Sequence, residues 1–88
     1  MGWRIEISAA ARRDLKKLDP PVSKRILDYL EREVMGRPDP RTVGKALVGE
    51  LAGYWRYRVG DYRILCHLED AALVVLVVKV DHRRQVYR

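Results

Sequence analysis

Hydrophobic positions in the first part of the chain predict one short strand followed by two helices. Apolar and polar side chains alternate over residues 3–7, which is typical of a strand with one buried face. Ser8 stands where a helix N-cap belongs, and apolar residues then recur at helical spacing. The Asp-Pro-Pro sequence at residues 19–21 ends that stripe and starts a second one, and Gly36 is a natural stop for it. The two stripes are Ala11, Leu15 and Leu18, and then Val22, Ile26, Leu27, Leu30 and Val34.

The second half of the chain has the period of β-strands. Residues 36–45, GRPDPRTVGK, are rich in glycine and proline and are expected to form an exposed loop. Over residues 54–59 the odd-numbered positions (Trp, Tyr, Val) share one face and the even-numbered positions (Tyr, Arg, Arg) share the other. Gly60-Asp61 predicts a hairpin turn before a second alternating strand. Residues 73–80 are apolar on both faces, which favours a central strand, and residues 81–88 are expected to form a polar tail.

The predicted order β-α-α-β-β-β indicates an α+β fold with a small, mainly antiparallel sheet and an N-terminal helix hairpin packed on one face. A chain of 88 residues has material for one core, so residues 1–88 are expected to form a single domain. The longest apolar run, residues 71–78, is far shorter than the roughly 20 residues of a membrane helix. Without a signal-peptide core at the N-terminus, we expect a cytoplasmic protein with no membrane partner. Cys66, the single cysteine, excludes an internal disulfide and is expected to be a core residue.

Charge changes this picture, because the basic residues are expected to gather on one sheet face. The chain has 18 Lys+Arg against 12 Asp+Glu, a net charge of +6. Guanidinium groups bind phosphate in a bidentate manner, and tyrosines stack on bases, so the pattern indicates a nucleic-acid site. The alternative is an exposed face that is merely charged and solvated. The residues concerned are Arg56, Arg58, Arg63, Arg83 and Arg84, with Tyr54, Tyr57 and Tyr87.

The two histidines are less informative. His82 directly precedes Arg83 and can exchange a proton near neutral pH. For His67 a surface or partner-contacting role is expected. Two histidines without placed carboxylates make a poor metal site, so no metal is expected.

The segment from residue 45 to residue 88 resembles the RelE branch of the RelE/ParE toxin superfamily. The matching pieces are KAL at residues 45–47, WRYRVGDYR at 55–63 and HRRQVY at 82–87, with glycines at positions 49 and 53 and Leu51 between them. The strand and two helices that precede this segment follow the family order. The resemblance therefore implies a RelE-like fold over the whole chain.

The resemblance also implies a function. RelE-like proteins are toxins of type II toxin–antitoxin systems, and they cleave mRNA in the 30S A site of the ribosome, which inhibits translation. The reaction needs no metal or other cofactor. The 2′-hydroxyl attacks the neighbouring phosphate, which leaves a 2′,3′-cyclic phosphate and a 5′-hydroxyl. A cognate RelB-like antitoxin neutralises the toxin, and operator DNA is bound only through the antitoxin.

Carried over by position, the family's catalytic residues match Arg56 and Arg58 as a basic pair, Arg63, Arg83, and Tyr87, which stacks on the mRNA base. We expect further RNA contacts from Tyr54, Tyr57, Arg84 and Lys45. Where some members carry lysines on the first strand of the sheet's basic face, this chain has arginines, which are poor general bases. We therefore expect either that His82 assists proton transfer or that electrostatic lowering of the 2′-hydroxyl pKa suffices.

Two other functions remain open on the sequence. A ParE-like toxin would inhibit DNA gyrase without cleaving nucleic acid, and an inactive module would use its arginines only for RNA or antitoxin contacts. ParE-like members lack the basic set, so this set favours the nuclease.

Overall fold

The computed structural model describes residues 2–82, which form a five-stranded sheet and a helix hairpin. The strands are β1 (Arg4–Ile7), β2 (Lys45–Ala46), β3 (Tyr54–Val59), β4 (Tyr62–Glu69) and β5 (Val74–His82), and the helices are α1 (Ala9–Lys16) and α2 (Pro20–Tyr29). A π-helical turn, Leu30–Val34, continues α2, and two 3₁₀ turns cover Pro40–Thr42 and Gly49–Leu51.

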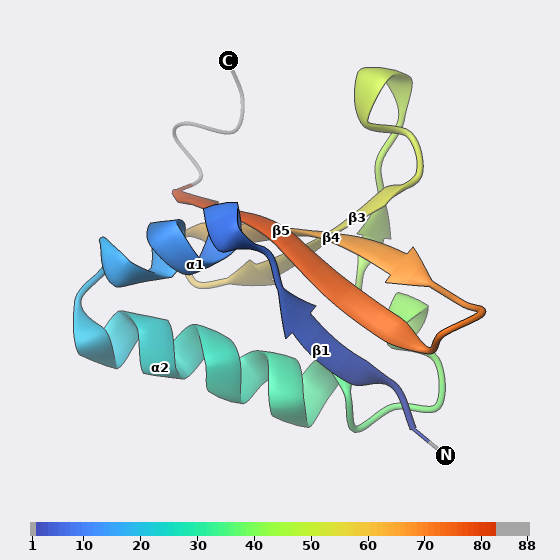
Figure 1. The fold of residues 1–88 in the computed structure, drawn as a ribbon, viewed down its shortest axis with the longest axis horizontal. Coiled ribbons are helices and arrows are strands. Elements are labelled where there is room, and N and C mark those ends of the chain that lie inside the picture. Colours follow the sequence, from blue (N-terminus) through green and yellow to red (C-terminus); the bar gives the residue numbers. More distant parts are fainter. Residues whose placement is uncertain (1, 83–88) are drawn as a thin grey trace.

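The sheet has the strand order β1-β5-β4-β3-β2. Strand β1 is parallel to β5, and the other three pairs are antiparallel. Both helices lie together on one side of the sheet (Figure 1). The predicted α+β fold, with a mainly antiparallel sheet and a helix hairpin on one face, is therefore confirmed, as is the central position of the C-terminal strand.

The core lies between the helix hairpin and the face of the sheet that it covers. Helical positions of the predicted stripes are buried there, including Ala11, Ile26 and Leu30. Alternate positions of the sheet meet them: Tyr57, Val59, Ile64, Cys66, Leu68, Val75, Val77 and Val80. Removal of this apolar surface from water is what drives the helices onto the sheet. Since Tyr57 and Val59 face the helices, Arg56 and Arg58 must face the opposite way.

Local sequence signals fix the two junctions that matter for this arrangement. The Ser8 hydroxyl accepts a hydrogen bond of 3.1 Å from the Ala11 N–H and so caps α1, as predicted. Between β3 and β4, Gly60 has φ +59°, a backbone conformation that glycine adopts readily. The predicted hairpin turn at Gly60-Asp61 is confirmed.

The structure corrects two boundaries. Lys45, predicted as the end of a loop, belongs to β2, which pairs with β3; two residues are too few for alternation to be visible in the sequence. Asp81 and His82, predicted as the start of a polar tail, extend β5, because their backbones pair with β4. The other residues of the predicted tail, 83–88, lie outside the described part of the chain.

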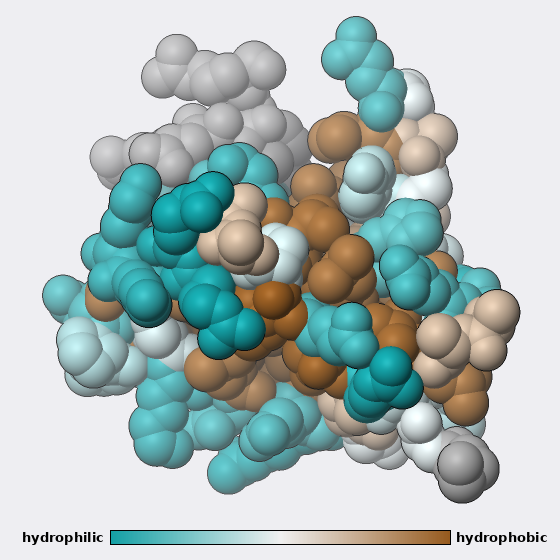
Figure 2. Space-filling model, viewed as in Figure 1, coloured by the Kyte–Doolittle hydropathy of each residue, from teal (hydrophilic) through white to brown (hydrophobic). Residues whose placement is uncertain are grey.

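Apolar and polar side chains separate on the molecular surface. Figure 2 shows hydrophobic side chains concentrated in the middle of the view, where Figure 1 places β1 and β5, and hydrophilic side chains along the helices at its lower left. Among residues 2–82, no helix is both long enough and apolar enough to cross a membrane.

Candidate nucleic-acid interface

Four basic side chains of β2, β3 and β4 share the face of the sheet that the helices leave open. In the sheet register Lys45 of β2 lies opposite Arg56 of β3, and Arg58 of β3 lies opposite Arg63 of β4. Because Arg56 and Arg58 are two positions apart on one strand, both pairs lie on the same face. We call this set the cationic face: Lys45, Arg56, Arg58 and Arg63. The structure thus brings together three of the arginines, and the lysine, that the sequence predicted for RNA.

The cationic face consists of two like-charge pairs side by side. Like charges directly opposite each other in a sheet are destabilising, so such an arrangement favours binding of an anion. Arg63 is only 8% exposed, which holds its guanidinium in a fixed position, whereas Arg58 is exposed. Within residues 2–82 Arg58 forms no ion pair. The face therefore combines one largely buried guanidinium with one that solvent can reach, and guanidinium groups of this kind bind phosphate in a bidentate manner.

Two of the tyrosines predicted to contact RNA, Tyr54 and Tyr57, differ in burial. Tyr54 is half-buried at the far end of the open face, where its ring meets the His67 ring edge-on at 5.7 Å. Tyr57 is fully buried, and its hydroxyl donates a 2.8 Å hydrogen bond to the Pro40 carbonyl. Burial raises the pKa of Tyr57. The prediction that Tyr57 contacts RNA is therefore wrong: its ring belongs to the core and presents no surface to a base.

The structure places His82 on the other side of the sheet from the cationic face. Its register partner is Tyr62, and the two rings meet edge-on at 5.3 Å. Both line a depression of about 420 Å³ beside α1, at the end of β5, whose lining also includes Asp14, Lys17, Lys79 and Asp81. The residue opposite Arg63 is instead Asp81, which the sequence reasoning did not single out. Arg83, Arg84 and Tyr87 lie outside the described residues.

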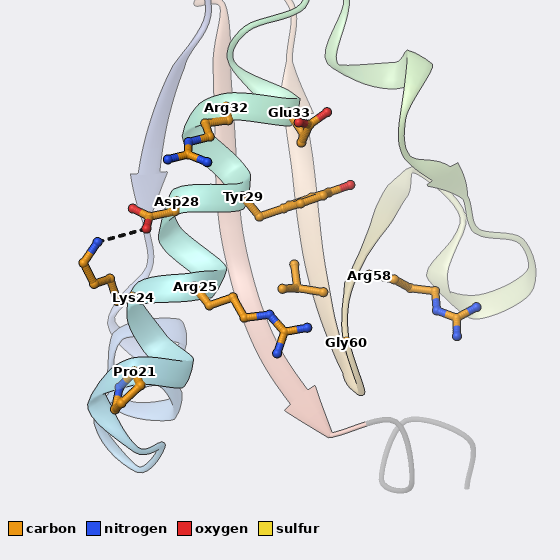
Figure 3. Close-up of a pocket in the computed structure, with 10 residues that line it drawn as sticks. Pro21, Lys24, Arg25, Asp28, Tyr29, Arg32, Glu33, Arg58 and Gly60 are labelled. Atoms are coloured by element: carbon orange, nitrogen blue, oxygen red, sulfur yellow. Dashed lines mark hydrogen bonds and ion pairs between the residues drawn. The ribbon is translucent and has the colours of Figure 1, made fainter.

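A larger groove, of about 590 Å³, runs between α2 and the β3–β4 turn (Figure 3). Arg25 reaches from α2 toward Gly60, where a Cβ atom would lie 2.8 Å from its Nη2. On the outer side of α2, Lys24 forms an ion pair of 3.0 Å with Asp28. Arg58 lines the edge of this groove, and Figure 3 shows its guanidinium pointing away from α2.

Arg41 anchors the loop that leads to β2. Its guanidinium lies 2.6 Å from an Asp70 carboxylate oxygen and 3.3 Å from one of Asp39. It also lies 5.9 Å from the centre of the Trp3 ring and 5.8 Å from that of Trp55. The hydrogen bond that Arg41 donates to the Asp70 carboxylate raises the pKa of Arg41. These contacts tie the loop to both ends of the sheet and so position Lys45; no spacing in the sequence predicts them, because the partners are far apart along the chain.

Comparisons with known proteins agree on one family. The model of the ParE toxin of type II toxin–antitoxin systems (parDE) matches residues 5–87. Toxin RelG of Mycobacterium tuberculosis is 35% identical over 88 residues, which cover 100% of this chain and 99% of that protein. The crystal structure of the toxin–antitoxin complex RelBE2 from the same organism contains a chain that matches with a TM-score of 0.85 and 34% identity, over 94% of this chain and 93% of that one. A chain of the intact E. coli RelBE complex shares the fold, with a TM-score of 0.70 at 16% identity, over 91% of this chain and 95% of that one.

The helix hairpin on one face of a five-stranded sheet matches the fold of the RelE-like toxins. The chain belongs to the RelE/ParE superfamily, and it is a toxin of a type II toxin–antitoxin system. The resemblance found in the sequence is confirmed.

Proposed function

We propose that this toxin is a ribosome-dependent endoribonuclease that cleaves mRNA in the 30S A site. The observation that carries the proposal is the cationic face, with its directly opposed Arg58 and Arg63. A gyrase inhibitor of the ParE type has no need for guanidinium groups gathered around one small anionic site.

The proposed reaction is attack of a 2′-hydroxyl on the adjacent phosphate. The bond from the 2′-oxygen to phosphorus forms as the bond to the 5′-oxygen breaks, which leaves a 2′,3′-cyclic phosphate and a 5′-hydroxyl. Negative charge builds on the phosphate oxygens in the transition state. Arg56, Arg58 and Arg63, already positioned by the sheet, stabilise that charge without reorganising. Arg83 and Tyr87 complete the proposed site, Tyr87 by stacking on the base.

The proton acceptor needs a separate account, because an arginine stays protonated throughout the physiological range. Two candidate groups stand near the end of β5, His82 and Asp81. The sheet register places their side chains on opposite faces, with Asp81 opposite Arg63 and His82 opposite Tyr62.

The test is primer extension on translating ribosomes after addition of purified toxin. We expect cuts within the A-site codon for the wild type. For Arg63→Ala we expect single-turnover cleavage slower by about 10²–10³, by analogy with removal of one transition-state donor. Arg12→Ala is the matched control, because Arg12 is exposed on α1, away from the cationic face. This variant should cleave at the wild-type rate. Loss of gyrase supercoiling without mRNA cuts would establish the ParE-type function instead.

We also propose that a RelB-like antitoxin neutralises this toxin. The similar toxin from Mycobacterium tuberculosis was crystallised in a toxin–antitoxin complex, and the net charge of +6 favours an acidic partner segment. Operator DNA would then be bound through the antitoxin. Coexpression of the toxin with such an antitoxin should restore translation and yield a complex that stays together during gel filtration.

A further inference from the structure

A β-bulge in β5 decides which side chains join the cationic face. Leu65 pairs with Lys79, but the next residue of β4, Cys66, pairs with Val77, so Val78 is an extra residue. Two side chains of the α1 region hold the chain there. The Ser8 hydroxyl donates to the Val78 carbonyl at 3.3 Å, and an Asp14 carboxylate oxygen accepts from the Val80 N–H at 3.0 Å.

The bulge reverses the faces of the residues that follow it. Val80 is 5% exposed and belongs to the core, and His82 lies on the same side, beside Tyr62. Asp81 consequently faces the other way and stands directly opposite Arg63. Without the extra residue the alternation would run in the other phase and would place His82 on the cationic face.

Asp81 is suited to accept a proton in this position. Its side chain is 19% exposed, so it is partly shielded from water yet accessible. Among residues 2–82 its one ion pair is with Lys79, whose Nζ lies 3.7 Å away, which is long for a hydrogen bond. The carboxylate therefore keeps acceptor capacity on the face where the arginines would hold a phosphate.

We propose that Asp81 is the general base of the cleavage reaction; this inference rests on the nuclease function proposed above. The 2′-oxygen forms its bond to phosphorus as its proton passes to an Asp81 carboxylate oxygen. The bond from phosphorus to the 5′-oxygen breaks with its electron pair on that oxygen, which takes a proton from water. Asp81 then returns its proton to the solvent, so the protein is unchanged after each cycle.

The first test compares Asp81→Asn with the wild type in single-turnover cleavage on programmed ribosomes. We expect the rate to fall by about 10²–10⁴, the usual contribution of a general base, with binding to the ribosome undiminished because a negative charge has been removed. Asp81→Glu should recover part of the rate. Glu69→Gln is the matched control, since Glu69 lies on the same strand pair at the distant end of β4, and its rate should stay at the wild-type value. Thermal unfolding of each variant verifies that it is folded.

The second test uses an mRNA with sulfur in place of the 5′-oxygen at the cleaved bond. A thiolate leaves without being protonated, so this substrate restores the rate of a variant that lacks a proton donor but not of one that lacks the base. We expect Asp81→Asn to stay slow on it.

Wild-type cleavage rates in Asp81→Asn, or restoration by the sulfur substrate, would overturn the assignment. So would a loss in His82→Ala with Asp81→Asn unaffected. Absence of any mRNA cleavage by the wild type would instead reject the nuclease function itself.

Discussion

Arg63 combines two properties that rarely occur together, since it is a charged residue that is only 8% exposed and another arginine lies directly across the strand pair. Charged side chains are seldom buried to this extent unless charges nearby compensate them. Its neighbours across the sheet are Arg58 on one side and Asp81 on the other. Arg63 thus lies between Arg58, which is suited to phosphate binding, and Asp81, which is suited to proton transfer. This position makes Arg63 the centre of the proposed site.

Two buried residues on the opposite face predict how stability depends on pH. Burial raises the pKa of the Cys66 thiol above 9.0 and that of the Tyr57 phenol above 10.0. Below these ordinary values both groups are protonated whether the chain is folded or not, so stability is unaffected. Above them the unfolded chain loses the protons while the folded chain keeps them. The free energy of unfolding should therefore fall with rising pH, by up to about 1.4 kcal/mol per pH unit for each group.

Urea denaturation between about pH 8 and pH 10.5 measures how the free energy of unfolding changes with pH. This pH range covers the ordinary pKa values of both groups. Cys66→Ala should show a shallower fall than the wild type, because the thiol no longer ionises on unfolding. Its lower absolute stability does not matter, since only the slope is compared. Equal slopes for the two proteins would show that the thiol does not resist ionisation in the fold.

At the scale of elements, α1 does more than cover the sheet. Its N-cap residue, Ser8, both starts the helix and donates to the bulge, and Asp14, two turns later, accepts from the strand beyond it. The helix therefore fixes the register of β5 against β4, and through that register it fixes the residues opposite Arg63. A residue with no contact to RNA can thus decide the composition of the cationic face.

Removal of the Asp14 carboxylate should therefore be costly. Asp14→Ala leaves the partly buried Val80 N–H without its acceptor, and we expect a loss of about 1–3 kcal/mol in the free energy of unfolding. Asp28→Ala serves as the control, because it removes only an exposed i,i+4 ion pair and should cost at most about 0.5 kcal/mol. Chemical denaturation of both variants gives the comparison. Equal losses would mean that the bulge does not depend on α1.

At the scale of the whole molecule, the sheet separates two tasks. One face is covered by the helix hairpin and forms the core, and the other presents the cationic face, over which residues 2–82 place no helix. The net charge of +6 adds a long-range attraction for RNA. Because the core is on the far side and Arg58 is exposed, Arg58 can be exchanged with little effect on packing.

This separation predicts how RNA binding responds to salt. If Arg56, Arg58 and Arg63 each contact a phosphate of single-stranded RNA, the logarithm of the association constant should fall with the logarithm of salt concentration with a slope of about −2. Arg58→Ala should weaken binding and reduce that slope by about 0.7 in magnitude, whereas Arg12→Ala should leave it unchanged. Fluorescence anisotropy with a 2′-O-methyl oligonucleotide, which cannot be cleaved by this route, provides the measurement. An unchanged slope for Arg58→Ala would remove it from the phosphate contacts.

The sequence by itself determined every feature that depends on neighbours along the chain. A period of two places Arg56 and Arg58 on one face, Ser8 caps a helix because of where it stands, and Gly60-Asp61 makes a two-residue turn. These are local rules of backbone geometry and hydrogen bonding, so they hold whatever the rest of the molecule does. Together with the family motifs they were sufficient for the fold and the class of protein.

Only the tertiary structure decided which residues meet across the sheet. The run from residue 73 to residue 80 is apolar on both faces. Its pattern therefore does not show which positions face the core, and it gives no sign of the extra residue at Val78. The bulge is held by contacts with Ser8 and Asp14, about 70 residues earlier in the chain, and it places Asp81 opposite Arg63, where an unshifted register would place Val80. The burial of Tyr57 and the pairing of Lys45 likewise depend on distant segments. Alternation along a strand predicts that two side chains share a face of the sheet. Only long-range packing determines whether that face is buried or open, and which residues of the neighbouring strand lie opposite.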